Sequence, residues 1–166
     1  MGKAESIKLD FMTKGDIDQV LAIEEASFSM PWSRNLFLSE FRSQMISRLI
    51  VALADKPERL VLGFTVFWLV EDEMHILNLA VKPEFRRKGI ARNLVLAALR
   101  RGHEQGAKRA YLEVRLSNVA AQKLYSALGF TGAGVRREYY DSPVEDAVLM
   151  TLEEGPLQGL IDRLKS

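Results

Sequence analysis

One stretch, EMHILNLAV (Glu73–Val81), constrains the fold more than any other because it lacks a polar face. From Met74 to Val81, apolar residues occupy both sets of alternating positions. A strand with one solvated face alternates apolar and polar residues, whereas a strand covered on both faces reads as a nearly continuous apolar run. We therefore expect a central strand here, in a sheet that has helices on both faces.

The rest of the chain alternates between strand-like and helix-like patterns. The predicted order is a strand, two helices, three strands, a helix, a strand, a helix and two strands, which is typical of an α/β fold with a mixed sheet. Strands are expected at Ile7–Met12, Ser47–Ala54, Arg59–Val70, Glu73–Val81, Arg109–Leu116, Thr131–Arg137 and Ala147–Leu152. Helices are expected within 13–28, after Ser33 with an apolar face of Leu36, Phe37 and Phe41, at Ile90–Glu104, and from a cap at Ser117 or Asn118 to Gly129.

The chain length of 166 residues is typical of one domain. We expect that domain to span residues 1–154, followed by a short amphipathic segment at 155–166. In this segment Pro156 can open a helix, and Leu157, Leu160, Ile161 and Leu164 have helical spacing. Docking on the domain and a contact in a dimer are both open for this segment, and the oligomeric state is not predicted.

The charge balance argues against a general nucleic-acid-binding protein. Lysine and arginine number 23 against 22 aspartates and glutamates, so the net charge is +1. The chain has no cysteine, which excludes disulfides, thiolate metal sites and a cysteine nucleophile and suits a reducing cytoplasm. No apolar run is long enough to cross a membrane. His75 and His103 have no ligand partners at metal-binding spacing, so no metal is expected.

The basic stretch FRRKGIAR (Phe85–Arg92) follows the apolar strand and leads into the helix predicted at Ile90–Glu104. Backbone N–H groups at the start of a helix are unpaired and favour a bound anion. Gly89 and Ala91 leave room near the backbone, and Arg86, Arg87, Lys88 and Arg92 can offset the charge of a phosphate. A solvated basic turn is the structural alternative.

The spacing Arg86-x-x-Gly89-x-Ala91 resembles the pyrophosphate-binding signature of the GCN5-related N-acetyltransferases, the GNAT superfamily. The order of elements also resembles that fold, from about Ile7 to Glu153. Four stretches are most similar to the RimI-type ribosomal-protein alanine N-acetyltransferases within it. They are MPWS, LNLAV with the basic loop, YLEVRLSNVAAQKLYSALGF and RREYYDSPVEDAVLM.

The resemblance implies acetyl-CoA as cosubstrate and a set of residues that bind it. The backbone of Leu79, Ala80 and Val81 would bind the pantetheine arm, and Asn118 would also contact the cosubstrate. The pyrophosphate would lie on the basic loop, at Arg86, Arg87, Lys88, Gly89, Ile90, Ala91 and Arg92.

The same resemblance implies that Glu113 is the general base and Tyr125 the general acid. An N-terminal ammonium, with a pKa of about 8, must lose a proton before it attacks a thioester. A carboxylate can accept that proton if partial burial raises its pKa. A surface ion pair with Arg115 is the alternative for Glu113, and a core position is the alternative for Tyr125.

The substrate side would be lined by Pro31 and Trp32 and by Tyr139 and Tyr140. Acidic residues near this second pair would suit a peptide with arginines close to its amino end: Glu138, Asp141, Glu145 and Asp146. Packing in the core or sheet is the alternative for the aromatic residues.

The predicted function is therefore acetyl transfer from acetyl-CoA to the N-terminal alanine of a protein, with a ribosomal protein as the implied substrate and direct attack in a ternary complex. A broad, archaeal-type N-terminal acetyltransferase is the alternative. Acetylation of a small amine or a lysine side chain is a further one. A non-catalytic CoA-binding module is the alternative that is not an enzyme. The presence of Glu113 and Tyr125 argues against it, because a binding module needs neither an acid nor a base.

Overall fold

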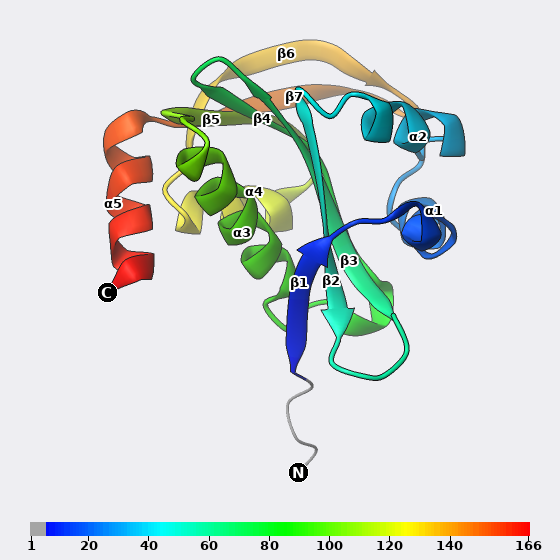
Figure 1. Ribbon diagram of the computed structural model, residues 1–166. Coiled ribbons are helices and arrows are strands. Elements are labelled where there is room, and N and C mark those ends of the chain that lie inside the picture. Colours follow the sequence, from blue (N-terminus) through cyan, green and yellow to red (C-terminus); the bar gives the residue numbers. More distant parts are fainter. Residues whose placement is uncertain (1–5) are drawn as a thin grey trace. The chain divides into compact units, whose positions relative to one another are not determined.

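The computed structural model describes residues 6–166. Its strands are β1 (Ile7–Phe11), β2 (Ser47–Ala54), β3 (Val61–Val70), β4 (Glu73–Val81), β5 (Arg109–Arg115), β6 (Thr131–Asp141) and β7 (Val144–Leu152). Its α-helices are α1 (Ile17–Ser27), α2 (Arg34–Arg42), α3 (Ile90–Glu104), α4 (Val119–Ala127) and α5 (Glu154–Lys165), and two 3-10 turns lie at Lys14–Asp16 and Pro83–Phe85. Figure 1 shows these elements, and their order is the predicted one.

The strands described in residues 6–166 form one sheet in the order β1-β2-β3-β4-β5-β7-β6. Strands β4 and β5 are parallel, with His75 opposite Tyr111, whereas β1–β2, β5–β7 and β6–β7 are antiparallel. The predicted fold class, a mixed sheet with flanking helices, is confirmed. Among the helices of residues 6–166, none combines the length and the apolar character that a membrane crossing requires.

The chain forms two compact units. The first contains the chain up to Phe67 together with Asn78–Ala98, and the second contains Trp68–Leu77 together with Leu99–Ser166. Strands β3 and β4 and helix α3 each contribute residues to both units.

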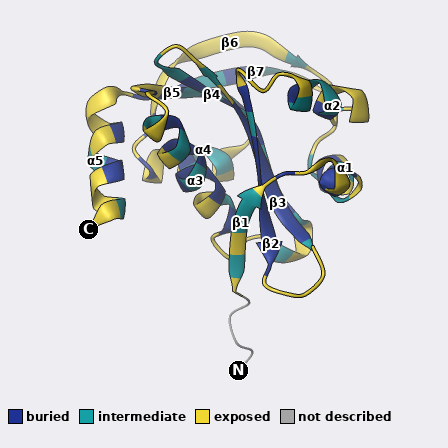
Figure 2. Ribbon diagram, viewed as in Figure 1, coloured by how far each residue is buried: buried dark blue, intermediate teal, exposed yellow. Residues whose placement is uncertain are grey.

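The core of the first unit is built on β2 and on Val61–Phe67 of β3, where nearly every residue is buried (Figure 2). Phe37 of α2 is fully buried, and its ring meets the edge of the Phe64 ring at a centroid distance of 5.6 Å. These two strands, rather than β4, have the more completely covered faces. In β4, Met74, Ile76, Asn78 and Ala80 are buried, whereas His75, Leu77 and Leu79 are only partly covered.

In the second unit, β5 alternates as its sequence predicts. Ala110, Leu112 and Val114 are buried, and the opposite face carries the partly buried Tyr111, Glu113 and Arg115. Helix α5 buries Leu157, Leu160 and Ile161. It is also joined to α3, because Nε2 of His103 lies 2.9 Å from Oε1 of Gln158.

Two local expectations were wrong. Leu36, expected on the apolar face of α2, is 38% exposed, whereas Phe37, expected on the same face, is fully buried. The last two strands are longer than predicted, because a register shift between Arg136 and Tyr140 lets β6 continue to Asp141. Glu138 lies in this irregular part with a φ of 49°. Its N–H donates to Oδ1 of Asp146, a side chain of β7, in place of a strand-to-strand backbone bond.

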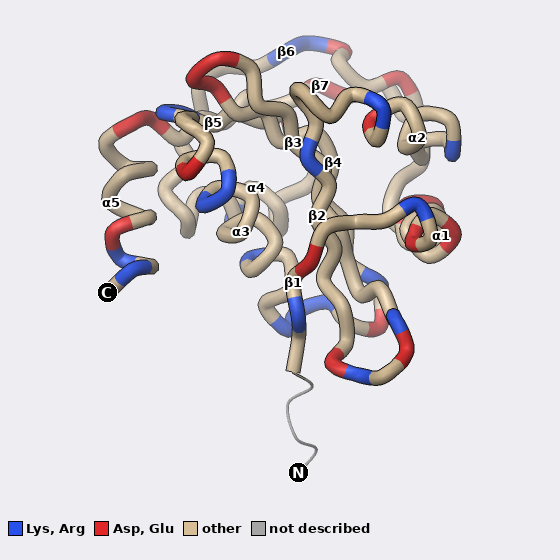
Figure 3. Tube along the Cα trace, viewed as in Figure 1, with Lys and Arg blue, Asp and Glu red and all other residues tan. Residues whose placement is uncertain are grey.

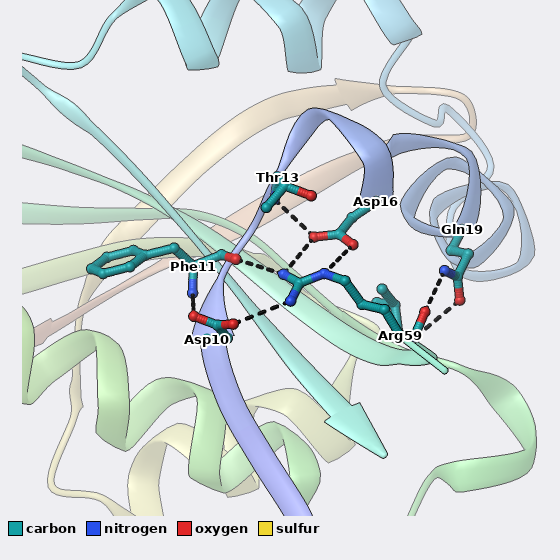
Figure 4. A network of polar contacts seen from close by, with 7 residues as sticks. Asp10, Phe11, Thr13, Asp16, Gln19 and Arg59 are labelled. Carbon is teal, nitrogen blue, oxygen red and sulfur yellow. Dashed lines mark hydrogen bonds and ion pairs between the residues drawn. The ribbon is translucent and has the colours of Figure 1, made fainter. Parts of the chain in front are cut away.

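Arg59, in the loop between β2 and β3, ties that loop to the start of the chain (Figure 4). Its Nε lies 2.7 Å from Oδ1 of Asp16, and its Nη1 lies 3.1 Å from Oδ2 of Asp10. The Asp16 side chain is 1% exposed, and it also accepts the Thr13 N–H at 2.8 Å. Burial opposes ionisation of Asp16, but the hydrogen bonds from Arg59 and Thr13 outweigh it, so the pKa of Asp16 is lowered. The Arg59 hydrogen bond lowers the pKa of Asp10 as well.

We expect Arg59→Met to lower the free energy of unfolding because it leaves the Asp16 carboxylate buried without its cation. The loss should be about 2 kcal/mol, below the roughly 3–5 kcal/mol of a fully buried pair, because the Arg59 side chain is 37% exposed. Urea denaturation at neutral pH measures it, with the exposed Arg42→Met as control. Equal midpoints for the two variants would contradict the prediction.

The same pair predicts the pH dependence of that loss. A carboxylate whose pKa is lowered by folding stabilises the protein above its unfolded pKa of about 3.9, and this contribution disappears as the pH falls through the folded pKa. The difference between the wild type and Arg59→Met should therefore shrink as the pH drops below about 4.

Candidate active site

The basic loop of the first unit connects β4 to α3 and contains two residues in the left-handed region. Arg87 has a φ of 62° and Gly89 a φ of 81°. The N–H of Asn93 donates to the Gly89 carbonyl at 3.0 Å, so the first four amides of the helix precede Asn93. A methyl group added at Gly89 would meet nothing within 4 Å, so the space beside the backbone is open.

The cations of this loop do different things. Arg86 is engaged within the protein: its Nε donates to the Val81 carbonyl and its Nη2 to Oγ of Ser27, both at 3.0 Å. Nζ of Lys88 lies 5.0 Å from the centre of the Phe85 ring. Arg87, Lys88 and Arg92, near the start of the helix, are exposed. Figure 3 colours the lysines and arginines along the chain blue. Arg86 thus braces the loop, while exposed cations surround the amides.

The strand before the loop is held by a close approach of backbones. A methyl group added at Gly63 of β3 would lie 2.9 Å from the Ala80 carbonyl oxygen, so only glycine fits there without displacing it. The Lys82 N–H donates to the Leu62 carbonyl at 2.7 Å. Leu79 is partly covered, whereas Ala80 and Val81 are buried.

In the second unit, Glu113 lies between a histidine and an arginine. Its Oε2 is 2.6 Å from Nε2 of His75, and its Oε1 is 3.5 Å from Nη2 of Arg136. The Glu113 side chain is 6% exposed. The His75 ring stacks on the Tyr111 ring with centroids 4.3 Å apart, which fixes the imidazole beside the carboxylate.

The expected rise in the pKa of Glu113 was wrong. Burial does favour the protonated form, but the hydrogen bond from His75 and the charges of His75 and Arg136 outweigh it, so the pKa is lowered. Arg115, which the alternative reading paired with Glu113, lies 3.4 Å from Glu145 through Nη1 and Oε1. Glu113 is therefore ionised at neutral pH, and its lowered pKa makes the carboxylate a weaker proton acceptor than expected from the sequence.

Tyr125, in α4, is 6% exposed, and its ring packs on Phe130 with centroids 5.6 Å apart. Burial, reinforced by the nearby Tyr140, raises the pKa of its phenol well above the usual range. The group consequently keeps its proton at physiological pH and can act only as a neutral donor. Asn118 is the N-cap of the same helix, where its Oδ1 accepts the Ala121 N–H at 3.1 Å and its amide NH₂ is left to serve another acceptor.

The two predicted substrate segments lie in different units. In the first, the Trp32 ring packs on Phe37 with centroids 5.2 Å apart, and Pro31 is exposed. In the second, the rings of Tyr139 and Tyr140 are perpendicular at 5.1 Å, and the Arg115 guanidinium lies 4.2 Å from the centre of the Tyr140 ring. Burial raises the pKa of Tyr140 to about 12.

Sequence reasoning missed His75, Arg136 and Glu24, a buried residue of α1. His75 was judged to stand alone because no carboxylate or histidine lies at metal-ligand spacing from it in the sequence. The available signal was the pairing of two parallel strands, since Glu113 follows Tyr111 by two residues and so lies on the same face. Within residues 6–166 no three His, Cys, Asp or Glu side chains gather closely enough to hold a metal ion.

Comparison with known proteins identifies the family. The model described as the Acetyltransferase (GNAT) family matches residues 17–130. The chain belongs to the GNAT acetyltransferase family. It is thus an enzyme, and acetyl-CoA is its acetyl donor.

The chain is similar to GNAT members of known name and structure. A Bacillus subtilis (strain 168) protein, provisionally named a ribosomal protein bS18-alanine N-acetyltransferase, is 36% identical over 81% of this chain and 87% of its own length. The Salmonella typhimurium enzyme of that name is 32% identical over 87% of this chain and 95% of its own length. The crystal structure of the Escherichia coli ribosomal-protein-S18-alanine N-acetyltransferase aligns with a TM-score of 0.80 at 29% identity, over 90% of this chain and 94% of that one. The structure of Ard1 from Thermoplasma volcanium aligns with a TM-score of 0.79 at 27% identity, over 89% of this chain and 97% of that one.

For this GNAT member we expect Arg136→Leu to raise the pKa of Glu113, because the variant removes a cation that favours the ionised carboxylate. The acidic limb of the pH profile of kcat/KM should then move to higher pH. Arg137→Leu, a change at the exposed neighbouring arginine of β6, is the matched control and should leave the limb in place. A limb that moves equally in both variants, or in neither, would contradict the prediction.

Proposed function

We propose that the protein acetylates the N-terminal α-amine of a protein, with the N-terminal alanine of a small-subunit ribosomal protein as substrate. Support comes from the names of the relatives in Bacillus subtilis and Salmonella typhimurium, which specify the alanine of ribosomal protein bS18. The observation that carries the chemistry is the Glu113 carboxylate, ionised and held by His75. A ribosomal protein substrate also implies a cytoplasmic enzyme.

The residues of the basic loop fit a pyrophosphate. Its oxygens would accept hydrogen bonds from the amides between Gly89 and Arg92, beside the open face of Gly89, with the exposed Arg87 and Arg92 offsetting their charge. Leu79, Ala80 and Val81 would present backbone groups to the pantetheine arm, and the Asn118 amide would donate to it. Lys88, Ile90 and Ala91 complete the loop, and Arg86 keeps it in place. Bound acetyl-CoA supplies a thioester carbonyl that an amine can attack.

The second unit carries the proton chemistry. Glu113 would take the proton of the substrate ammonium, directly or through a water, and His75 would hold the carboxylate or share that proton at Nε2. As the bond from the amine nitrogen to the acetyl carbon forms and the carbon–sulfur bond breaks, Tyr125 would donate its phenol proton to the departing sulfur. As the amide forms, the nitrogen would release its second proton, which would return through solvent to the Tyr125 phenolate, so that the products are an amide, a thiol and the proton taken by Glu113.

Substrate recognition would involve Pro31 and Trp32 in the first unit and Tyr139 and Tyr140 in the second.

The division of the chain into an acetyltransferase domain at 1–154 and a segment at 155–166 also remains a prediction. Residues 1–5 of that domain lie outside the described part of the chain. Broad N-terminal specificity is the second candidate.

The substrate proposal predicts which of three peptides becomes acetylated. We expect mass spectrometry to detect one added acetyl group on a peptide that begins Ala-Arg-Tyr, and none on a peptide with a blocked N-terminus and a free lysine. A peptide that begins Met-Glu separates the two candidates, since its modification would favour broad specificity. Modification of the lysine peptide alone would refute α-amine transfer.

The proposed roles of Glu113 and Tyr125 predict that their replacement lowers the catalytic rate and leaves the affinity for acetyl-CoA unchanged. Glu113→Gln and Tyr125→Phe should each lower kcat about 100-fold or more, because each removes one proton-transfer group. Steady-state kinetics and calorimetric titration with acetyl-CoA measure the two quantities. Glu104→Gln, a change at an exposed glutamate of α3, should match the wild type. If kcat is unchanged in Glu113→Gln, another group is the base.

A further inference from the structure

Glu24 is a buried carboxylate that the proposed acetyl transfer does not use. It lies in the last turns of α1 and is 1% exposed. Each of its oxygens accepts one hydrogen bond at 2.9 Å: Oε1 from the Trp32 N–H and Oε2 from Nδ2 of Asn78. A single side chain therefore joins helix α1, the Met30–Trp32 segment and strand β4, all within the first unit.

The Asn78 end of this network leads directly to the strand assigned to acetyl-CoA. Asn78 immediately precedes Leu79, Ala80 and Val81 and is 7% exposed. Its backbone carbonyl accepts the Thr65 hydroxyl at 2.9 Å, so the residue is held from β3 as well. Glu24 therefore accepts a hydrogen bond from a residue, Asn78, whose backbone Thr65 already holds in place.

The same helical turn also contacts the basic loop. The Ser27 hydroxyl donates to the Ile23 carbonyl at 2.6 Å and accepts Nη2 of Arg86 at 3.0 Å. Arg86 in turn donates from Nε to the Val81 carbonyl. The end of α1 is thus bonded to the segment before α2, to β4 and to the loop after β4.

At the other end, the Trp32 segment has few further attachments that could define its position. Met30 is 54% exposed and Pro31 is also exposed, so neither is anchored by burial. The Trp32 ring packs on Phe37, and the Trp32 N–H is directed at Glu24. The backbone bond to Glu24 and the ring contact together define where this segment lies.

A carboxylate is a costly group for this place. Burial raises the pKa of Glu24, while the two hydrogen bonds from Trp32 and Asn78 oppose the rise. An apolar side chain of similar size would fill the space without that penalty. What an apolar side chain would not provide is two directed acceptors, one for each donor.

We propose that Glu24 is a positioning residue that holds Met30–Trp32 in the conformation that receives the peptide N-terminus. This inference rests on the proposed function, which assigns Pro31 and Trp32 to peptide binding. Glu24 acts through the Trp32 N–H and touches neither substrate. Its removal should weaken peptide binding and leave acetyl-CoA binding unchanged, because Thr65 still holds the strand at Asn78.

Four variants separate positioning from general stability. Glu24→Met keeps the volume and removes both acceptors, and Glu24→Asp withdraws the carboxylate by one methylene. Glu24→Gln can restore both bonds, since its oxygen accepts the Trp32 N–H and its NH₂ donates to Asn78 after the Asn78 amide turns over. Glu25→Gln, the same change at the exposed neighbour, is the matched control.

We expect KM for the Ala-Arg-Tyr peptide to rise about tenfold in Glu24→Met, the equivalent of about 1.4 kcal/mol, and about fivefold in Glu24→Asp, where one net hydrogen bond is lost. Glu24→Gln should stay within about threefold of the wild type, and the Kd for acetyl-CoA should stay within about twofold in every variant, because the cosubstrate strand keeps its bonds. If Glu24→Met does not fold, Glu24→Asp decides the question.

An unchanged peptide KM in the folded Glu24 variants would overturn the proposal. So would a parallel weakening of acetyl-CoA binding, which indicates a general structural role. A Glu24→Gln variant as impaired as Glu24→Met would also overturn it, because charge rather than hydrogen bonding would then be required.

A fluorescence measurement separates this inference from the proposed function. In a Trp68→Phe background, Trp32 is the remaining tryptophan, and its emission should move to longer wavelength in Glu24→Met or Glu24→Asp and not in Glu25→Gln. If the wild type acetylates no peptide, the proposed function is wrong while the emission still reports whether Glu24 holds the segment. Emission that does not move in either Glu24 variant refutes the positioning role itself.

Discussion

A polar side chain buried in the interior of this protein costs free energy unless it finds hydrogen-bond partners within the fold. Strands β2 and β3 are covered almost completely along the first unit, and one face of β4 is buried. Asn78 enters this interior and is met by Glu24 through its side chain and by Thr65 through its carbonyl. The need to satisfy one amide thus fixes a helix and two strands relative to each other within that unit.

The same requirement shapes the chemistry of the second unit. Glu113 lies on the partly covered face of β5, where burial alone would raise its pKa. His75 and Arg136 reverse that tendency, so the carboxylate is charged but largely shielded from solvent. Burial and the neighbouring Tyr140 both raise the pKa of Tyr125, so its phenol keeps its proton. The environments of the two groups therefore push their pKa values in opposite directions, which is how acid and base roles are separated.

Periodicity and local signals predicted the element order, the fold class, a helix cap at Ser117 or Asn118 and the alternation of β5, because each depends on residues close together in the chain. The basic loop was located for the same reason. The expectations that failed involve distant residues. The bulge in β6 depends on Asp146 of β7, and the pKa of Glu113 depends on His75, which lies 38 positions earlier.

By itself, the sequence determined the family and the residue types available for chemistry: a basic loop at a helix start, a glutamate on a strand and a tyrosine on the following helix. Only the tertiary structure decided how those groups are paired and charged. It assigned Arg86 to bracing the loop, His75 to Glu113, Arg115 to Glu145, and Glu24 to the Trp32 backbone. The physical reason is that hydrogen bonds and charge interactions act over a few ångströms in space, and strand pairing brings together side chains that sequence spacing keeps apart.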